Sequence, residues 1–157
     1  MSLRHVPLEQ IDQSQLQRLI DEPVSESRDI EYKRDTYGNA DKDHGEYLAD
    51  ISSFGNTAGG EIIIGMTEQA GVPTGFSPLQ IDADKEVLRL QNIALSGMQP
   101  RIFGLAVHAV PIAGGGSVLV VRIPRSYNLP HRIVSAGVGS SSVLCEIIGR
   151  KIRTQRR

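Results

Sequence analysis

Three consecutive isoleucines, Ile62, Ile63 and Ile64, constrain the fold of this chain more than any other part of its sequence. A strand that is apolar and β-branched at every position offers no face to water, so it belongs in the middle of a sheet covered on both sides. Gly59 and Gly60 stand just before it, and glycine commonly ends a helix because it adopts left-handed backbone conformations at little cost. Upstream, apolar residues recur at helical three- and four-residue steps, at Tyr47, Leu48, Ile51, Phe54 and Ala58. The sequence therefore predicts a helix packed on a central buried strand.

The rest of the pattern predicts two further helices and three further strands. One helix begins after Asp12, which forms a partial capping box with Gln15, and ends before Pro23. Alternating polar and apolar residues predict a strand at residues 30–33, residues 67–74 are expected to be a loop, and residues 84–96 a third helix. Residues 105–112 and 118–123 are predicted strands joined by a glycine-rich turn. The order α-β-α-β-α-β-β predicts a single α+β domain, a mixed β-sheet with helices packed on it.

Length and composition favour one domain and one core, because the chain has 157 residues of which 39% are hydrophobic. No run approaches the roughly 18 apolar residues of a membrane-spanning helix. Residues 1–11 lack the apolar segment of a signal peptide and are interpreted as an N-terminal leader before a domain at residues 12–136. The single cysteine, Cys145, excludes an internal disulfide. We therefore expect a cytoplasmic protein with no membrane partner.

The net charge of −1 hides an uneven distribution along the chain. Residues 1–100 contain 8 Lys and Arg against 17 Asp and Glu, whereas residues 101–157 contain 9 Lys and Arg against one acid, Glu146. Such asymmetry favours a polyanionic partner for the basic part. Five of those nine cations lie in the last eight residues, however, and a basic run of this kind is often only a solvated tail.

Four motifs occur together here in the order known from one family. The first is ESRDIEYK at residues 26–33, and the second is ISSFGNTAGGEIIIG at residues 51–65. The third is an acidic-glycine loop with Glu68 and Gly71, and the fourth is IPRS at residues 123–126 followed by Pro130 and His131. On these motifs the chain, over residues 14–132, resembles the Schlafen/AlbA-like DNA-binding domain family. The resemblance implies a mixed α/β fold and DNA binding, often in bacterial transcriptional regulators.

The family also includes metal-dependent endoribonucleases that cut structured RNA, and the resemblance places their acidic cluster at Glu26, Glu31 and Glu68. Three carboxylates could hold Mg²⁺ or Mn²⁺ through hard oxygen ligands, and such a metal would activate water. Glu68 departs from the family pattern, which has an aspartate there. The alternative interpretation is structural: Glu31 and Lys33 form an exposed same-face ion pair, and Glu26 only precedes a strand.

Binding without catalysis is the leading hypothesis, with nucleic acid, either DNA or structured RNA, as the partner. The proposed phosphate contacts are Lys33, Arg122, Arg125 and Arg132. Because aromatic residues are only 4% of the chain and tryptophan is missing, backbone contact is expected rather than base stacking. A third hypothesis is a homodimerising module that pairs at a sheet edge.

Five further motif residues are expected to shape the domain rather than to react: Asn56 by capping backbone groups, His131 by shaping a loop, and the glycines Gly59, Gly60 and Gly65. Some relatives carry the label of a divergent AAA ATPase. The chain has no Gly-x4-Gly-Lys-Ser/Thr phosphate loop, and Gly59-Gly60 precedes a strand rather than opening a helix. ATP binding is therefore not expected.

Residues 137–157 depart from the family and are interpreted as a divergent basic tail. Codons compatible with residues 143–154 can be read one base later as FFARSSAGKYEL, which restores the strand that the family has at this place. We hypothesise that a frameshift replaced the original C-terminus, and in that case the basic run there says nothing about nucleic acid.

Overall fold

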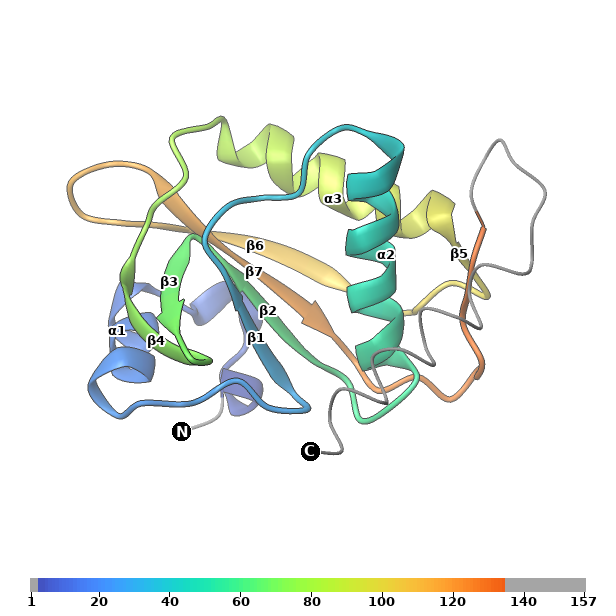
Figure 1. Cartoon of the computed structure of the whole chain (residues 1–157), viewed down its shortest axis with the longest axis horizontal. Helices are drawn as coiled ribbons and strands as arrows, with labels where there is room; N and C mark the ends of the chain where they lie inside the picture. The colour runs from blue at the N-terminus through green and yellow to red at the C-terminus, as the bar shows by residue number, and fades with distance from the viewer. Residues whose placement is uncertain (1–2, 135–157) are drawn as a thin grey trace.

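A four-stranded mixed sheet forms the centre of the molecule, which a computed structural model describes for residues 3–134 (Figure 1). The strands are β1 (Ile30–Lys33), β2 (Gly60–Ile64), β6 (Ala106–Pro111) and β7 (Ser117–Ile123), arranged in the order β1-β2-β7-β6. β1 is parallel to β2, while β2–β7 and β7–β6 are antiparallel. The predicted α+β class with a mixed sheet is confirmed, as is the hairpin between the last two predicted strands.

The isoleucine strand β2 lies in the interior of the sheet, and all five of its residues are buried. Ile62 and Ile64 face a core formed with helices α2 (Asp41–Gly55) and α3 (Ala83–Gly97). Ile63 faces a second core on the other side of the sheet, formed with α1 (Gln13–Asp21) and the N-terminal residues. Both faces are covered, which is why the strand can be apolar throughout.

The helices begin at residues whose side chains satisfy backbone donors. The Asp12 carboxylate accepts hydrogen bonds from the N–H groups of Ser14 and Gln15, and the Gln15 side chain accepts one from the Asp12 N–H, so the predicted capping box is present in full. α2 begins at Asp41, and the carboxylate of Asp43 in its first turn accepts a hydrogen bond from the Ala40 N–H at 3.2 Å.

The predicted loop at residues 67–74 is wrong, because these residues form most of a β-hairpin. β3 (Met66–Gln69) pairs antiparallel with β4 (Val72–Phe76), with an irregular register after Thr67. Pro73 and Gly71 argue against a strand in the sequence, but a two-stranded ribbon tolerates both at its turn and outer edge. Two short strands, β5 (Met98–Gln99) and β8 (Arg132–Ile133), also pair and were not predicted.

Residues 3–11, part of the segment interpreted as an N-terminal leader, pack on the central sheet. They form two short 3-10 helices, η1 (Leu3–His5) and η2 (Leu8–Gln10), on the face opposite α2 and α3. Leu3, Leu8 and Ile11 are buried against the sheet. Periodicity could not show this, because three apolar residues at irregular spacing have neither a helical nor a strand period.

Among residues 3–134, no helix has both the length and the apolar character needed to cross a membrane. The basic tail predicted at residues 137–157, together with Cys145, lies outside the described residues.

Candidate functional site

Lys33 lies at the end of β1 within a cluster of carboxylates. Side chains along β1 point alternately to the two faces of the sheet. Ile30 and Tyr32 therefore lie in one core, while Glu31 and Lys33 point toward α2. The Lys33 Nζ is 3.2 Å from a Glu31 oxygen, 3.2 Å from an Asp50 oxygen and 3.5 Å from a Glu46 oxygen. Burial by itself lowers the pKa of the Lys33 ammonium, but the Asp50 and Glu31 carboxylates more than offset this and hold it above its ordinary value.

Asp50 is the centre of this cluster and is only 4% exposed. Besides contacting Lys33, its Oδ2 accepts a hydrogen bond of 2.8 Å from the Tyr37 hydroxyl. Burial, and then the Asp50 carboxylate, raise the pKa of the Tyr37 phenol, so Tyr37 stays protonated as the donor. Lys33, predicted as a phosphate contact, is therefore neutralised inside the protein by three carboxylates.

Glu26 and Glu68 both attach to the turn of the β3–β4 hairpin. The Glu26 N–H donates to the Gly71 carbonyl at 2.6 Å, and the Glu68 carboxylate accepts from the Gly71 N–H at 2.6 Å. The Glu26 carboxylate accepts a further hydrogen bond of 3.0 Å from the Tyr32 N–H of β1. Glu26 thus joins the hairpin to the edge strand of the main sheet, while Glu68 closes the hairpin turn.

The three predicted metal ligands do not form a metal site. Glu31 is directed to Lys33, the Glu26 carboxylate accepts from the Tyr32 N–H, and the Glu68 carboxylate accepts from the Gly71 N–H. Within residues 3–134, no group of three or more His, Cys, Asp or Glu side chains is placed to hold a metal ion. The donor set needed for the endoribonuclease hypothesis is consequently not assembled, and we derive no reaction step through Mg²⁺ or Mn²⁺.

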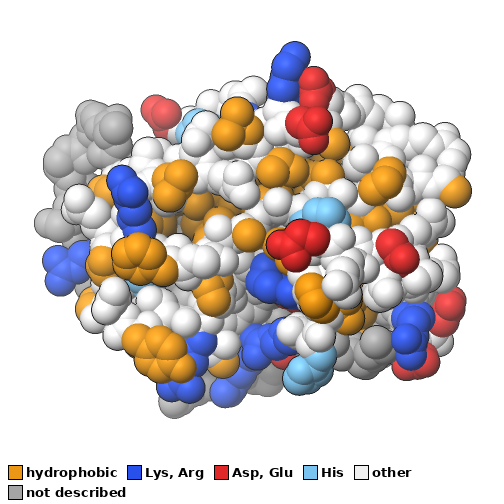
Figure 2. Space-filling model, turned by 180° about the vertical axis from the view of Figure 1, so that it is seen from behind, with side chains coloured by type: hydrophobic (Ala, Val, Ile, Leu, Met, Phe, Trp, Pro, Cys, Tyr) orange, Lys and Arg blue, Asp and Glu red, His pale blue; other side chains and the backbone are white. Residues whose placement is uncertain are grey.

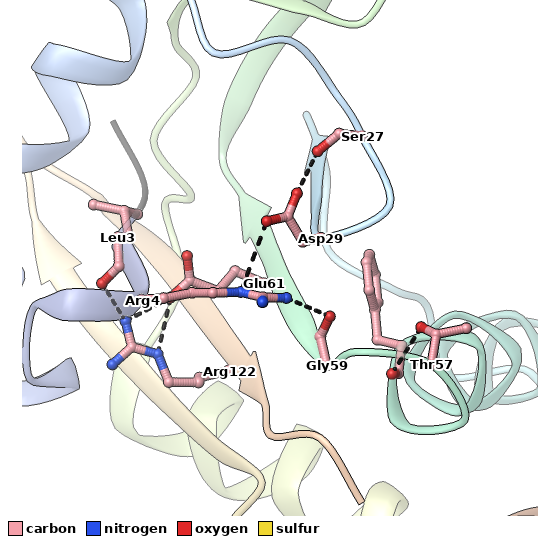
Figure 3. A network of polar contacts seen from close by, with 9 residues as sticks. Leu3, Arg4, Ser27, Asp29, Thr57, Gly59, Glu61 and Arg122 are labelled. Carbon is pink, nitrogen blue, oxygen red and sulfur yellow. Dashed lines mark hydrogen bonds and ion pairs between the residues drawn. The ribbon is translucent and has the colours of Figure 1, made fainter.

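Arg122 is used to hold the N-terminus on the sheet (Figure 3). From β7, its guanidinium donates to Glu61 Oε1 at 2.8 and 2.5 Å, and to the carbonyl oxygens of Leu3 at 2.8 Å and Val6 at 2.7 Å. Burial raises the pKa of Glu61, although the Arg122 guanidinium opposes that rise. These bonds engage the Arg122 guanidinium within the domain, and its role as a phosphate contact stays a prediction.

A second arginine, Arg4, extends the same network. It donates to the Gly59 carbonyl at 2.6 Å and lies 3.8 Å from an Asp29 oxygen (Figure 3). Two arginines therefore hold the N-terminal helix η1 on the sheet. Arg122 reaches it from β7, and Arg4 belongs to η1 itself.

Asn56 and His131 connect the end of α2 to the segment before β8. The Asn56 side chain accepts from the His131 N–H at 2.9 Å and donates to the His131 carbonyl at 3.3 Å. The His131 Nδ1 lies 2.6 Å from the Pro100 carbonyl oxygen, which can only accept, so Nδ1 carries the proton. Residues 99–101 and 131–132 are held side by side as a result.

The predicted motif glycines permit close packing around the same region. Gly59 has φ +77°, and a Cβ there would lie 2.6 Å from both the Arg125 nitrogen and the Ile123 carbonyl oxygen. A Cβ on Gly60 would collide with the Phe54 ring, and one on Gly65 would lie 3.3 Å from the Ser77 carbonyl oxygen. The glycine pair thus lets β2 begin against the chain that leads from β7 to Arg125.

Five exposed residues gather at this end of the domain and form what we call the arginine–aromatic end: Arg101, Phe103, Arg125, Tyr127 and Arg132. They come from two segments, β5–β6 and β7–β8, which are joined by the β5–β8 pairing, by the bond between His131 and Pro100, and by contact of Gly104 with Pro124. None of the three arginines forms an ion pair with another described residue.

The five residues of the arginine–aromatic end come from a stretch of the sequence without acidic residues. Residues 87–134 contain no Asp or Glu. Figure 2 shows hydrophobic and basic side chains lying together in the lower left of that face, where no acidic side chain is drawn between them. Elsewhere on that face, acidic and basic side chains are interspersed.

Sequence reasoning found Arg125 and Arg132 of this surface and missed Arg101, Phe103 and Tyr127. The acid-free run at residues 87–134 was the available signal for Arg101. Glu46 and Asp50 were also missed, although their four-residue spacing on a predicted helix places both on one face. No sequence signal shows that Phe103 and Tyr127 are exposed, since aromatic residues are usually core.

Comparison with known proteins agrees with the fold. Residues 26–143 match the family described as Schlafen, AlbA_2. No curated protein is significantly similar to the chain.

Two solved structures are similar to the chain. One is the N-terminal domain of a RecG-related protein from Nitrosomonas europaea, with a TM-score of 0.57, 22% identity, and coverage of 82% of this chain and 84% of that one. The other is the DIP2311 protein from Corynebacterium diphtheriae, with a TM-score of 0.48, 16% identity, and coverage of 76% of this chain and 23% of that one. At these identities, the first likeness establishes a shared fold.

Proposed function

This chain belongs to the Schlafen AlbA_2 family, and we propose that it is a nucleic-acid-binding domain whose contact surface is the arginine–aromatic end. The observation that carries the proposal is the arginine cluster itself: Arg101, Arg125 and Arg132 are exposed, lie on adjoining segments, and have no acidic side chain among residues 87–134. Guanidinium groups that form no ion pair with another described residue are available for bidentate contact with phosphate oxygens.

The other arginines show why this surface differs from the rest of the molecule. Arg89 is bonded to Glu86 and to loop carbonyls, and Arg122 to Glu61, so both charges are already balanced. Lys33 is surrounded by three carboxylates. A polyanion would meet mixed or neutralised charge at those places, whereas Arg101, Arg125 and Arg132 form no ion pair with another described residue.

The similarity to the N-terminal domain of a protein named as related to an ATP-dependent DNA helicase is consistent with a nucleic-acid partner. A role in transcriptional regulation, a cytoplasmic location and a homodimer remain predictions from the sequence. The endoribonuclease alternative is less supported, because its three carboxylates are engaged elsewhere.

A salt titration of oligonucleotide binding tests the proposal. We expect affinity for a labelled strand, followed by fluorescence anisotropy, to fall with salt, with a log–log slope of roughly −0.7 to −0.9 per phosphate contacted. The triple variant R101A/R125A/R132A should bind weakly and show a slope smaller by about 2 to 3.

The matched control removes three exposed arginines from other parts of the chain, R18A/R28A/R34A. It changes the net charge by the same amount, so a general charge effect would weaken both variants equally. Equal weakening, or no binding by the wild-type protein at low salt, would reject the arginine–aromatic end as the contact surface.

A further inference from the structure

The chain has few aromatic side chains, but the structure exposes two of them to solvent on segments that are joined to each other. Of its three phenylalanines and four tyrosines, Tyr32, Tyr37, Tyr47 and Phe54 are buried. Phe103 is 76% exposed and Tyr127 is 86% exposed. Both belong to the arginine–aromatic end, on the two segments that pack against each other. Exposing large rings to water is unfavourable, and rings that stay exposed together mark a contact surface.

The arginines and the rings alternate along each segment. Arg101 is followed by Phe103, and Arg125 by Tyr127, with the Arg125 guanidinium carbon 5.5 Å from the centre of the Tyr127 ring. An arginine against an aromatic face holds that ring in place while its remaining donors stay available. Proteins that bind single-stranded nucleic acid use this arrangement: cations lie along the phosphates, and the bases stack on aromatic rings.

A duplex cannot use this surface fully. Its bases are stacked on one another, so ring faces in a protein reach only its ends. Reading a major groove requires a helix or a two-stranded ribbon that projects into it. At the arginine–aromatic end, the contact residues lie on loops and on the two-residue strand β8, and neither a helix nor a long ribbon carries them. An unpaired strand, by contrast, has base faces to offer.

We propose that the arginine–aromatic end binds single-stranded nucleic acid, with bases stacked on Phe103 and Tyr127 and phosphates held by Arg101, Arg125 and Arg132. This rests on the proposed function and adds the strandedness of the ligand and the mode of base contact. It also replaces the expectation, drawn from composition, that base stacking is negligible: the number of rings is small, but their placement is what matters.

The first experiment compares three ligands of equal length: a thymidine strand, a duplex, and an abasic phosphodiester strand. We expect the wild-type protein to prefer the thymidine strand over the other two. Each of F103A and Y127A should lose on the order of tenfold in affinity for the thymidine strand, as expected for one stacked base, and should bind the abasic strand as the wild type does. The matched control, I81A/L88A, removes two exposed apolar side chains near and on α3 and should change neither affinity.

Tyrosine fluorescence gives a second, direct measurement. The chain has no tryptophan, and Tyr127 is the only one of its four tyrosines that is exposed. A base stacked on Tyr127 should quench its emission on titration with the thymidine strand but not with the abasic strand. The variant Y127L, which keeps an apolar side chain, should abolish the quenching.

The outcomes separate the two proposals. If R101A/R125A/R132A loses binding while F103A and Y127A bind all ligands like the wild type, the stacking inference is refuted and the contact surface stands. If the duplex binds as tightly as the thymidine strand, the preference for single strands is refuted. If the protein binds none of the three ligands at low salt, the proposed function itself fails.

Discussion

Replacing Arg122 by leucine tests the structural role that the tertiary structure gives to this residue. The variant removes four hydrogen bonds: two to Glu61 and one each to the carbonyls of Leu3 and Val6. Glu61 is 2% exposed and would be left as a buried carboxylate without its partner. Breaking a buried pair in this way costs about 3–5 kcal/mol, because the remaining charge is uncompensated.

The double variant E61L/R122L separates the ion pair from the rest of the network. With both charges gone, the desolvation penalty disappears, and only the two carbonyls of Leu3 and Val6 lose a donor, at about 0.5–1.5 kcal/mol each. We therefore expect the double variant to be more stable than R122L, which a cycle of urea unfolding midpoints would measure as a coupling free energy.

The pH dependence of R122L provides an independent check. Burial already raises the pKa of Glu61, and removal of the guanidinium raises it further. A carboxyl group with a raised folded-state pKa contributes stability that is present below its unfolded pKa and lost as pH rises through the folded one. The deficit of R122L should thus shrink as pH falls from neutral toward about 4, the ordinary value for glutamate. A loss under about 1 kcal/mol, independent of pH, would refute the buried-pair reasoning.

Three further outcomes follow from the structure. G59A should destabilise the domain by at least about 1–2 kcal/mol, because φ is +77° and a Cβ would meet the Arg125 backbone. G45A, on α2 with open space around it, should stabilise the domain by up to about 1 kcal/mol. Thermal melts of both variants measure the two effects. Deleting residues 1–11 should prevent stable folding, because the loss of each of the buried side chains Leu3, Leu8 and Ile11 costs about 2–5 kcal/mol of stability. A circular dichroism spectrum of an intact fold would contradict this. Above about pH 10 the domain should lose stability, because burial raises the pKa of Tyr32, Tyr37 and Tyr47 and their phenols ionise more readily once unfolded. Because Tyr127 is exposed, the measurement uses the Y127F variant, in which tyrosinate absorbance that rises well before the loss of ellipticity would contradict the prediction.

Local patterns in the sequence predicted the elements that have strong periodicity or strong caps. The capping box at Asp12 and the alternation at residues 30–33 gave α1 and β1 nearly to the residue. The β3–β4 hairpin was missed because Pro73 and three nearby glycines read as loop. The N-terminal helices were missed because their burial depends on Arg122 and Arg4, which are distant in sequence or outside any periodic pattern.

In the candidate site, too, the sequence could predict some features and not others. Residue type and order identified Arg125 and Arg132 as cations without a local acid, and the structure leaves both exposed. Residue type also selected Lys33 and Arg122, and the family resemblance selected Glu26, Glu31 and Glu68. The partners of Lys33, Arg122 and Glu68 lie on α2, in the sheet centre and in the β3–β4 turn. A linear sequence cannot show whether a charged side chain already has a partner, since that depends on which strands are neighbours.

What the sequence determined by itself is the buried isoleucine strand and its two covered faces, because burying three β-branched side chains in a row leaves no other stable arrangement. Only the tertiary structure decided which charged side chains pair with others in the domain and which are exposed to a binding partner. The physical reason is that pairing of charges and exposure of rings depend on distances of a few ångströms between segments far apart in the chain. Those distances join the segments that carry Phe103, Tyr127 and three arginines without an ion-pair partner among the described residues.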